Sequence, residues 1–207
     1  MDLGCGTGSH TFQLAHHLGG SIVAFDNHLP YLKQLMANAE KLGYDELIRT
    51  VQGDMHNLAF SAGFFDLIWS EGAIYIMGFR EGLNYLKSFL TNQGYLAVTE
   101  ICWLKNNQPL HLKEFWEQEY AAMNTVDGNI EIIRDLRYNL VDYFILSPLS
   151  WWDNYYIPLE NRLIQMRKKY IENDQALELI EFVQLEIDLY RKYPEFYGYV
   201  FYIMQKS

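Results

Sequence analysis

The sequence has little cysteine and few basic residues. It contains only two cysteines, Cys5 and Cys102, in 207 residues. Two such distant cysteines form neither a disulfide framework nor a zinc-binding spacing, so we expect reduced thiols and a cytoplasmic setting. Sixteen Lys and Arg stand against 26 Asp and Glu, a formal net charge of −10. We expect no nucleic-acid partner, because binding to phosphates relies on a basic patch.

Long apolar runs and linker-like stretches are also missing. No apolar segment approaches the length of about 18 residues that a membrane span needs, and no segment is rich in Gly, Ser or Pro. A chain of this length suits one domain. We expect a single domain over residues 1–207, with a core at 1–104, a mainly helical region at 105–195 and a final strand at 196–207.

The first eight residues hold an acid, Asp2, followed by Gly4, Gly6 and Gly8. Glycine tolerates positive φ and lets the backbone approach a ligand closely. Residues 9–15 read as the start of a helix, whose first N–H groups face the same space. This pattern predicts a nucleotide- or nucleoside-binding turn of an α/β fold.

Apolar runs and helical periodicity alternate along the rest of the chain. We expect helices at 7–18, 30–42 and 80–90, strands at 21–25, 47–52, 65–69 and 95–101, and a turn at 92–94. Beyond Cys102 we expect helices at 110–123, 130–137, 159–172 and 175–193, with strands at 141–146 and 197–204. This order predicts a Rossmann-like, doubly wound and mostly parallel sheet with a helical insertion before the last strand.

Polar residues follow the predicted strands. Asp26 stands 22 positions after Gly4, about the distance at which an acid meets ribose hydroxyls in nucleotide-binding folds. Asp54 follows the third strand, and its carboxylate can accept from an exocyclic amine such as that of adenine. Ser70 and Glu71 follow the fourth strand. Since ligands of open α/β sheets bind beyond the carboxyl ends of the strands, we expect these residues to share one site.

Together these motifs resemble those of the class I S-adenosylmethionine-dependent methyltransferases. The matching stretches are Asp2-Leu3-Gly4-Cys5-Gly6-Thr7-Gly8, Phe25-Asp26, Gly53-Asp54-Met55 with Leu58 and Phe60, Phe65 to Ser70, and Leu90 to Val98. Gln93-Gly94 stands where the family has a glycine pair. The resemblance covers residues 1–104 and is closest to the small-molecule branch that includes the quinone-biosynthesis enzymes. Ser70 to Tyr75 and Tyr197 to Tyr202 are similar to a narrower group of bacterial methyltransferases.

The resemblance implies S-adenosyl-L-methionine as cofactor, with no metal. The backbone of Gly4, Cys5 and Gly6 would flank the methionine part, Asp26 would hold the ribose, and Asp54 with the Met55 backbone would hold adenine. Asp2, Gly8, Asn27 and Ser70 complete the implied cofactor-binding set. The reactive group belongs to the cofactor, so the protein mainly binds, orients and shields.

Glu71 and Tyr75 are the candidates for catalytic residues. A base is needed only if the acceptor must lose a proton. Glu71 is either that base or a carboxylate that holds the backbone or the cofactor's ammonium group, and Tyr75 either takes part in the chemistry or packs in a lid. His56 and His111 are further base candidates, although such histidines are more often structural or at the surface.

A small-molecule acceptor is favoured over a macromolecule. Ser70-Glu71-Gly72-Ala73 stands where amino-group methyltransferases of bases and glutamine carry an Asn/Asp-Pro-Pro-aromatic motif. Aromatic residues make up 16% of the sequence, and two readings of them stay open: they line an acceptor cavity, or they fill the core. The aromatic residues proposed as a cavity lining are Trp103, Trp116, Trp151, Trp152, Tyr155 and Tyr156. A homodimer is compatible with the sequence.

Two other functions compete with methyl transfer. One is a degenerate, non-catalytic binding module, and the other is an NAD-dependent oxidoreductase, against which the glycine spacing and the positions of Asp2 and Asp54 argue. The family normally places a full strand and one or two helices before the glycine turn, whereas only Met1 precedes Asp2 here. We therefore expect a truncated N-terminus, either in a fragment of a longer chain or in a product that begins late. The central strand should be nearly absent, with an empty slot between its neighbours.

Overall fold

The computed structural model describes residues 1–207, whose contacts divide into two units. The first, which we call the sheet unit, comprises Met1–Glu100, Asp127–Phe144 and Phe201–Ser207. The second, the helical unit, comprises Ile101–Val126 and Ile145–Val200. The expected boundaries near residues 104 and 195 remain a prediction.

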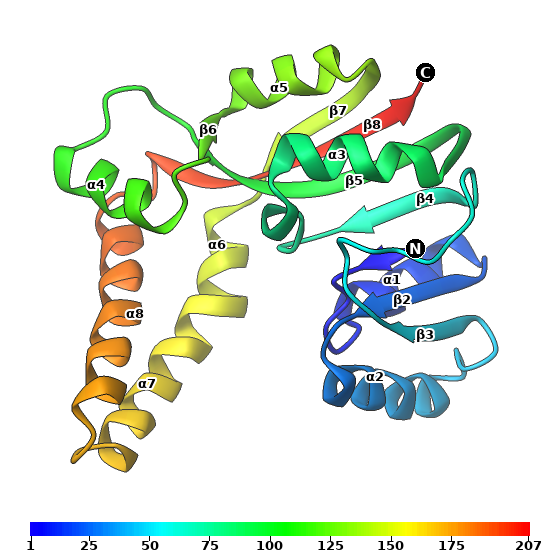
Figure 1. The fold of residues 1–207 in the computed structure, drawn as a ribbon. Helices are drawn as coiled ribbons and strands as arrows, with labels where there is room; N and C mark the ends of the chain where they lie inside the picture. The colour runs from blue at the N-terminus through cyan, green and yellow to red at the C-terminus, as the bar shows by residue number, and fades with distance from the viewer. The chain divides into compact units, whose positions relative to one another are not determined.

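The strands form an eight-stranded sheet in the order β3-β2-β1-β4-β5-β8-β7, with β6 paired to β5 (Figure 1). Parallel pairing joins β1 to β2 and β4, β2 to β3, and β5 to β4 and β6. The strands are β1 (Asp2–Leu3), β2 (Ile22–Asp26), β3 (Ile48–Gln52), β4 (Phe65–Ser70), β5 (Leu90–Trp103), β6 (Asn124–Thr125), β7 (Tyr138–Ile145) and β8 (Tyr197–Lys206). The predicted mostly parallel α/β fold is confirmed, and so are the helices inserted between the neighbouring strands β7 and β8.

Helices alternate with the early strands and fill the insertion. They are α1 (Ser9–Leu18), α2 (Leu29–Leu42), α3 (Phe79–Leu86), α4 (Leu110–Glu119), α5 (Val126–Asp135), α6 (Pro148–Trp151), α7 (Ile157–Lys169) and α8 (Asp174–Lys192). Short 3-10 segments span Ile74–Met77 and Lys87–Phe89, and a π-helical turn spans Trp152–Tyr156. Gly19 and Gly43 end α1 and α2 in the left-handed conformation, which glycine adopts without a Cβ penalty.

Small and aliphatic side chains build the core around α1 and α2. Its buried members are Cys5, Leu14, Ala15, Ile22, Ala24, Leu32, Leu35, Ala39 and Ile48. They recur at helical spacing in α1 and α2 and sit in the strands β2 and β3 that these helices cover. This packing fixes where α1 begins relative to the sheet, and so where the glycine turn lies.

The central strand β1 spans only two residues, as expected, and residues 1–3 occupy the slot between its neighbours at their carboxyl ends. Asp2 pairs with both Ala24 of β2 and Trp69 of β4. The Met1 nitrogen donates to the Leu67 carbonyl at 2.7 Å, and the Met1 carbonyl accepts from the Trp69 N–H at 2.8 Å. Three residues therefore supply the backbone partners that hold β2 and β4 around the turn.

Several predicted boundaries differ from the structure. The turn expected at 92–94 lies inside β5, where Gln93 has φ of 63° and the pairing with β4 shifts register. From Phe65 to Leu67 the pairing on β5 advances from Leu90 to Tyr95, and this irregularity absorbs the extra β5 residues without ending the strand. The helix expected at 110–123 ends at Glu119, and the one expected to end near Leu90 gives way to a 3-10 turn after Leu86.

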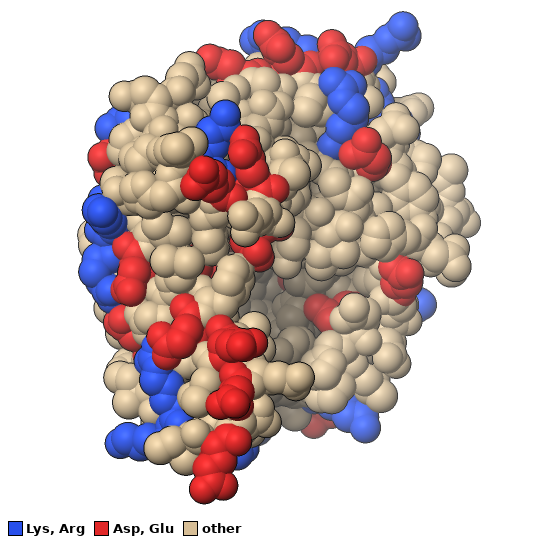
Figure 2. Space-filling model, turned by 60° about the vertical axis from the view of Figure 1, so that its left-hand side comes forward, with Lys and Arg blue, Asp and Glu red and all other residues tan.

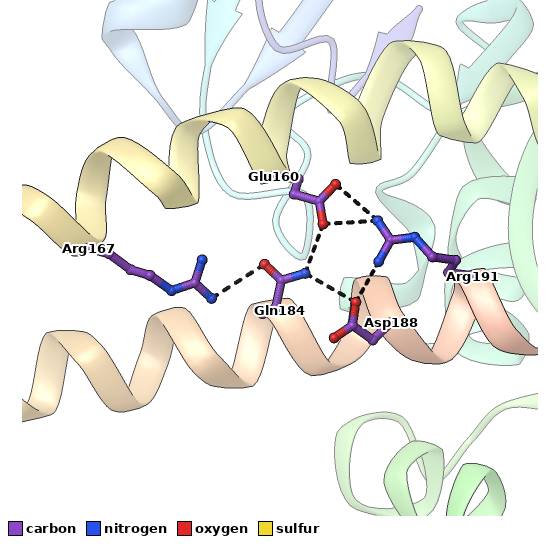
Figure 3. Close-up of polar contacts among 5 residues, drawn as sticks. All are labelled: Glu160, Arg167, Gln184, Asp188 and Arg191. Atoms are coloured by element: carbon purple, nitrogen blue, oxygen red, sulfur yellow. Dashed lines mark hydrogen bonds and ion pairs between the residues drawn. The ribbon is translucent and has the colours of Figure 1, made fainter.

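The helical unit contains the α7–α8 pair, which an aromatic core supports on one side. Between the two helices, Arg191 binds both carboxylate oxygens of Glu160 at 2.9 Å and reaches Asp188 at 2.6 Å. Gln184 links Glu160 to Asp188 and accepts from Arg167 at 3.4 Å (Figure 3). Because these contacts join residues of both helices, they fix how α7 and α8 pair.

Candidate functional site

The glycine turn folds back onto the end of β2. Gly4 and Cys5 both donate their N–H to the Phe25 carbonyl, at 2.8 and 3.1 Å. Gly4, Gly6 and Gly8 have φ of 75°, 54° and 95°. Residues with a side chain rarely adopt such values, so the alternating glycines are a requirement of the backbone path.

The three glycines face different surroundings. A Cβ on Gly4 would lie 2.4 Å from the Ala73 Cβ, and one on Gly8 would lie 2.6 Å from the Leu35 side chain. A Cβ on Gly6 would meet nothing within 4 Å. Gly4 and Gly8 are therefore glycines because the fold is crowded there, whereas Gly6 borders open space that a ligand can occupy.

Asp2 lies beneath the turn, with 2% of its surface exposed. Its Oδ2 accepts a hydrogen bond from the Thr11 hydroxyl at 2.6 Å, which ties the turn to the first turns of α1. Burial raises the pKa of the Asp2 carboxyl, and the bond from Thr11 opposes this rise. In this structure Asp2 braces the turn from inside the fold.

Asp26 ends β2 and joins it to the glycine turn. Its Oδ2 accepts from the Gly6 N–H and its Oδ1 from the His28 N–H, both at 2.8 Å. Asn27 follows in an exposed position, and its carbonyl accepts from the Gln52 side chain at 3.1 Å. The predicted ribose-binding acid therefore lies against the open side of Gly6.

Asp54 and Met55 lie on the loop after β3. The Asp54 Oδ1 contacts both the backbone N–H and the ring Nδ1 of His56 at 2.9 Å, and these bonds lower the pKa of the Asp54 carboxyl. Both contacts use Oδ1, which leaves Oδ2 for a ligand donor on this exposed side chain. The Met55 Cε lies 3.9 Å from the place of a Cβ on Gly4, so this loop borders the turn.

The loop after β4 reaches the same turn from the other side. The buried Ser70 donates its hydroxyl to the Leu3 carbonyl at 3.0 Å. The Glu71 Oε1 accepts from the Trp69 indole N–H at 2.8 Å, and its Oε2 lies 3.4 Å from the His10 Nε2. Tyr75 follows on the 3-10 segment with 45% of its surface exposed. The structure thus brings Glu71 close to the glycine turn and holds both of its oxygens.

The sequence motifs do not identify His10 as a site residue. It occupies the first turn of α1, two positions after Gly8, and its partner Glu71 is 61 positions away in the sequence. Its place in the first turn after a glycine loop is the only local signal. The pairing itself depends on β4 lying beside β1.

The two other histidine candidates have neighbours of their own. The His56 ring is held by Asp54, and His111 lies on α4 in the helical unit, where its ring packs on Tyr193 at 5.1 Å. The aromatic candidates belong mainly to the core of that unit. Trp116 and Tyr156 are buried members of it, Trp103, Trp151 and Trp152 pack against them, and Tyr155 is half exposed.

The described geometry suits a nucleoside with an attached charged group. Gly6 borders open space, Asp26 offers acceptor capacity to a diol, and Asp54 offers an acceptor to an amine. The residues therefore fit S-adenosylmethionine. No group of three or more His, Cys, Asp or Glu side chains is arranged to hold a metal ion. None of the helices is both long and apolar enough to cross a bilayer.

The chain belongs to the methyltransferase domain family, whose model matches residues 1–177. It is 29% identical over 190 residues to the sterol 24-C-methyltransferase of Pneumocystis carinii, covering 83% of this chain and 48% of that protein. It is 24% identical over 153 residues to the (+)-O-methylkolavelool synthase of Herpetosiphon aurantiacus, covering 71% and 53%. The chain thus spans about half the length of these curated relatives.

Solved structures confirm the fold. A methyltransferase of Geobacter sulfurreducens, in complex with S-adenosylhomocysteine, matches 100% of this chain and 83% of its own with a TM-score of 0.79 at 17% identity. A methyltransferase of Thiobacillus denitrificans, also with S-adenosylhomocysteine, matches 100% and 84% with a TM-score of 0.77 at 20% identity. The expected family is confirmed, and the expected cofactor agrees with the ligands named for these structures.

Proposed function

We propose that this chain transfers a methyl group from S-adenosylmethionine to a small-molecule acceptor by in-line displacement. The observation that carries the proposal is the open, left-handed position of Gly6, whose N–H is bound to the Asp26 carboxylate. A backbone that leaves room for a ligand beside a ribose-binding acid is what a nucleoside site requires.

Each residue of the site has a proposed task. The backbone of Gly4, Cys5 and Gly6 flanks the cofactor's methionine part. Asp26 accepts from the ribose hydroxyls, since a carboxylate has about four lone-pair sites and its two observed bonds use only part of them. The Asp54 Oδ2 accepts from the adenine amine, with Asn27 and Met55 beside the ring.

Asp2, Gly8 and Ser70 support this site from within the fold. Asp2 fixes the start of α1, and Ser70 fixes the end of β4 against β1. Gly8 keeps clear of Leu35. When bound, S-adenosylmethionine supplies a methyl group on a positively charged sulfur, and the protein orients the acceptor and excludes water.

Tyr75 is proposed to act at the reacting end of the site, and Glu71 to bind the cofactor beside it. Tyr75 is half exposed on the segment after β4, where its hydroxyl is able to contact an acceptor. Glu71 has both oxygens engaged by Trp69 and His10, which favours a binding role over that of a base.

The proposed acceptor is a small molecule, and the proposed compartment is the cytoplasm. On the face shown in Figure 2, basic side chains are scattered among acidic ones and form no broad patch. Together with the net charge of −10, this disfavours a polyanionic partner. Neither Cys5 nor Cys102 takes part in a disulfide, and a reducing compartment would keep both as thiols. We place the chain in the small-molecule branch that includes the quinone-biosynthesis enzymes.

Calorimetric titration with S-adenosylhomocysteine and with NAD tests this function. We expect S-adenosylhomocysteine to bind and NAD not to bind. Asp26→Ala should lower the affinity for S-adenosylhomocysteine by more than about tenfold, because it removes charge-assisted hydrogen bonds. The circular dichroism spectrum should stay unchanged. His17→Ala, on the last turn of α1, serves as the control. Binding of NAD alone, or unchanged affinity in Asp26→Ala, would refute the proposed site.

A further inference from the structure

Three side chains from two elements meet beside the glycine turn. Trp69 at the end of β4 donates its indole N–H to the Glu71 Oε1 at 2.8 Å, and the Glu71 Oε2 lies 3.4 Å from the His10 Nε2 on α1. The Trp69 ring packs on Phe201 at 4.9 Å. Glu71 is therefore anchored by a packed indole on one oxygen and faces an imidazole with the other.

The pair is accessible from outside the fold. The His10 side chain is 52% exposed and that of Glu71 is 18% exposed. Both lie at the carboxyl ends of β1 and β4, next to the point where Ala73 closes on Gly4. A ligand that follows the glycine turn from Asp26 toward β4 reaches this pair.

The segments that build the site contain no permanent positive charge. Neither residues 1–32 nor residues 50–79 include a Lys or an Arg. The basic side chains in these segments are all histidines. Apart from His10, each contacts another neighbour: His56 contacts Asp54, His28 packs on Tyr31, and His16 contacts Tyr44 and His17. Only His10 is paired with Glu71 beside the turn.

We propose that His10 and Glu71 form a charge pair that binds the amino-acid end of the cofactor, an inference that rests on the proposed function. Glu71 accepts from the ligand's ammonium group, and His10 donates to its carboxylate. An ionised carboxylate keeps lone-pair sites beyond the two contacts seen here. Protonated imidazole has two N–H donors, so one can face Glu71 while Nδ1–H serves the ligand.

This assignment explains why the site needs no Lys or Arg. An amino acid carries one positive and one negative charge on neighbouring atoms, and the pair presents the opposite charges side by side. His10 is then a specificity residue, because it distinguishes ligands that carry the amino-acid end from nucleosides that lack it.

Two probes separate this role from a structural one. S-adenosylhomocysteine carries the amino-acid end, whereas 5′-methylthioadenosine has the same nucleoside and sulfur without it. We would titrate both calorimetrically into the full chain and into His10→Ala, Glu71→Gln and the double variant. His17→Ala, on the same helix and outside the site, is the matched control, and thermal unfolding checks each fold.

We expect both single variants to bind S-adenosylhomocysteine about tenfold more weakly or worse, because each loses a charge-assisted contact. Affinity for 5′-methylthioadenosine should stay unchanged. In the double variant the affinity for S-adenosylhomocysteine should fall by less than the product of the two single fold-changes, because the two side chains contact each other.

Equal losses for the two probes would overturn the proposal and assign the pair a structural role. Unchanged affinity for S-adenosylhomocysteine would overturn it as well and leave the pair to act on the acceptor. In either case, binding of both probes by the wild-type chain would leave the proposed function intact. If the wild-type chain bound neither probe, the proposed function itself would fail, and this inference with it.

Discussion

The core around α1 and α2 of the sheet unit and the core of the helical unit bury different kinds of side chains. Around α1 and α2 the sheet unit packs alanine, leucine, isoleucine and Cys5. The core of the helical unit contains aromatic residues in close contact, with Tyr190 between Trp151 at 4.5 Å and Tyr156 at 5.1 Å. Small aliphatic side chains allow helices to lie close to a sheet, whereas large rings fill the wider spaces between crossing helices.

The units also differ in where they place polar atoms. In the sheet unit the polar side chains gather at the carboxyl ends of β1, β2 and β4. In the helical unit some polar atoms lie within the core, where the Tyr156 hydroxyl donates to Glu186 at 2.8 Å. The Tyr197 hydroxyl and the Trp116 indole nitrogen are buried there without a well-formed partner, although Trp116 is near enough to oppose the burial-driven rise of the Tyr197 pKa. The polar groups of the candidate site therefore lie in the sheet unit.

Truncating the aromatic core should have the largest effect. Tyr190 is 1% exposed, so Tyr190→Ala leaves a cavity and should lower the free energy of unfolding by about 3–5 kcal/mol. Urea unfolding followed by tryptophan fluorescence measures this. Tyr190→Phe keeps the ring and is the control. A loss below about 1 kcal/mol in Tyr190→Ala would show that this core is loosely packed.

The glycine turn offers a contrast within the sheet unit. Gly4→Ala combines positive φ with a clash against Ala73, so it should cost about 2–4 kcal/mol of stability and abolish ligand binding. The Cβ of Gly6→Ala meets no atom, so this variant should lose only about 1–2 kcal/mol of stability. It should still weaken the binding of S-adenosylhomocysteine, because its Cβ enters the open space. Gly19→Ala, also left-handed and uncrowded, controls for strain. Equal binding by Gly6→Ala and Gly19→Ala would argue against a ligand at Gly6.

Each unit contains a buried or half-buried acid, Asp2 or Glu186, whose titration should be visible in the free energy of unfolding. Burial raises the pKa of Asp2 and of Glu186 above their unfolded values of about 4. The folded state then binds the proton more tightly than the unfolded state does. The stabilisation from each acid is therefore fully present below about pH 4 and is lost as the pH rises through the folded-state pKa. Asp2→Asn and Glu186→Gln should each flatten the decline in stability above about pH 4.

Unfolding free energies measured from pH 3 to 8 test this expectation. Each amide still offers an oxygen to Thr11 or Tyr156, so neither exchange removes the hydrogen bond outright. A steeper decline in either variant than in the wild-type chain would contradict the assigned direction.

The smallest effect should come from the polar contacts between α7 and α8. The side chains of Arg191 and Glu160 are 48% and 31% exposed, and ion pairs that solvent reaches contribute at most about 1 kcal/mol. Arg191→Ala should therefore lower the melting temperature only slightly, and salt should reduce the difference. Arg162→Ala on α7, outside this network, is the control. A loss comparable to that of Tyr190→Ala would mean that the network, rather than the aromatic core, holds the two helices together.

Much of the sheet unit follows from its sequence because its signals are local. Alternating glycines, apolar strands and acids just after them lie within a few residues of one another, so Asp26 and Asp54 can be placed without the structure. The positions of Gln93 and Gly94 mislead, because the register shift that keeps them inside β5 depends on its neighbour β4. The helical unit gave weaker signals, since its aromatic residues suit a cavity lining and a core equally well.

The sequence by itself determined the family, the mostly parallel α/β order and the glycine turn proposed to bind a nucleoside, because these depend on residue type and short spacing. The tertiary structure decided the roles within that turn. It made Gly4 a packing glycine and Gly6 an open one, buried Asp2 under α1, and brought His10 to Glu71. The physical reason is that β4 must lie beside β1 before residues some 60 positions apart can meet. Such contacts arise from how strands pair, and no local pattern encodes them.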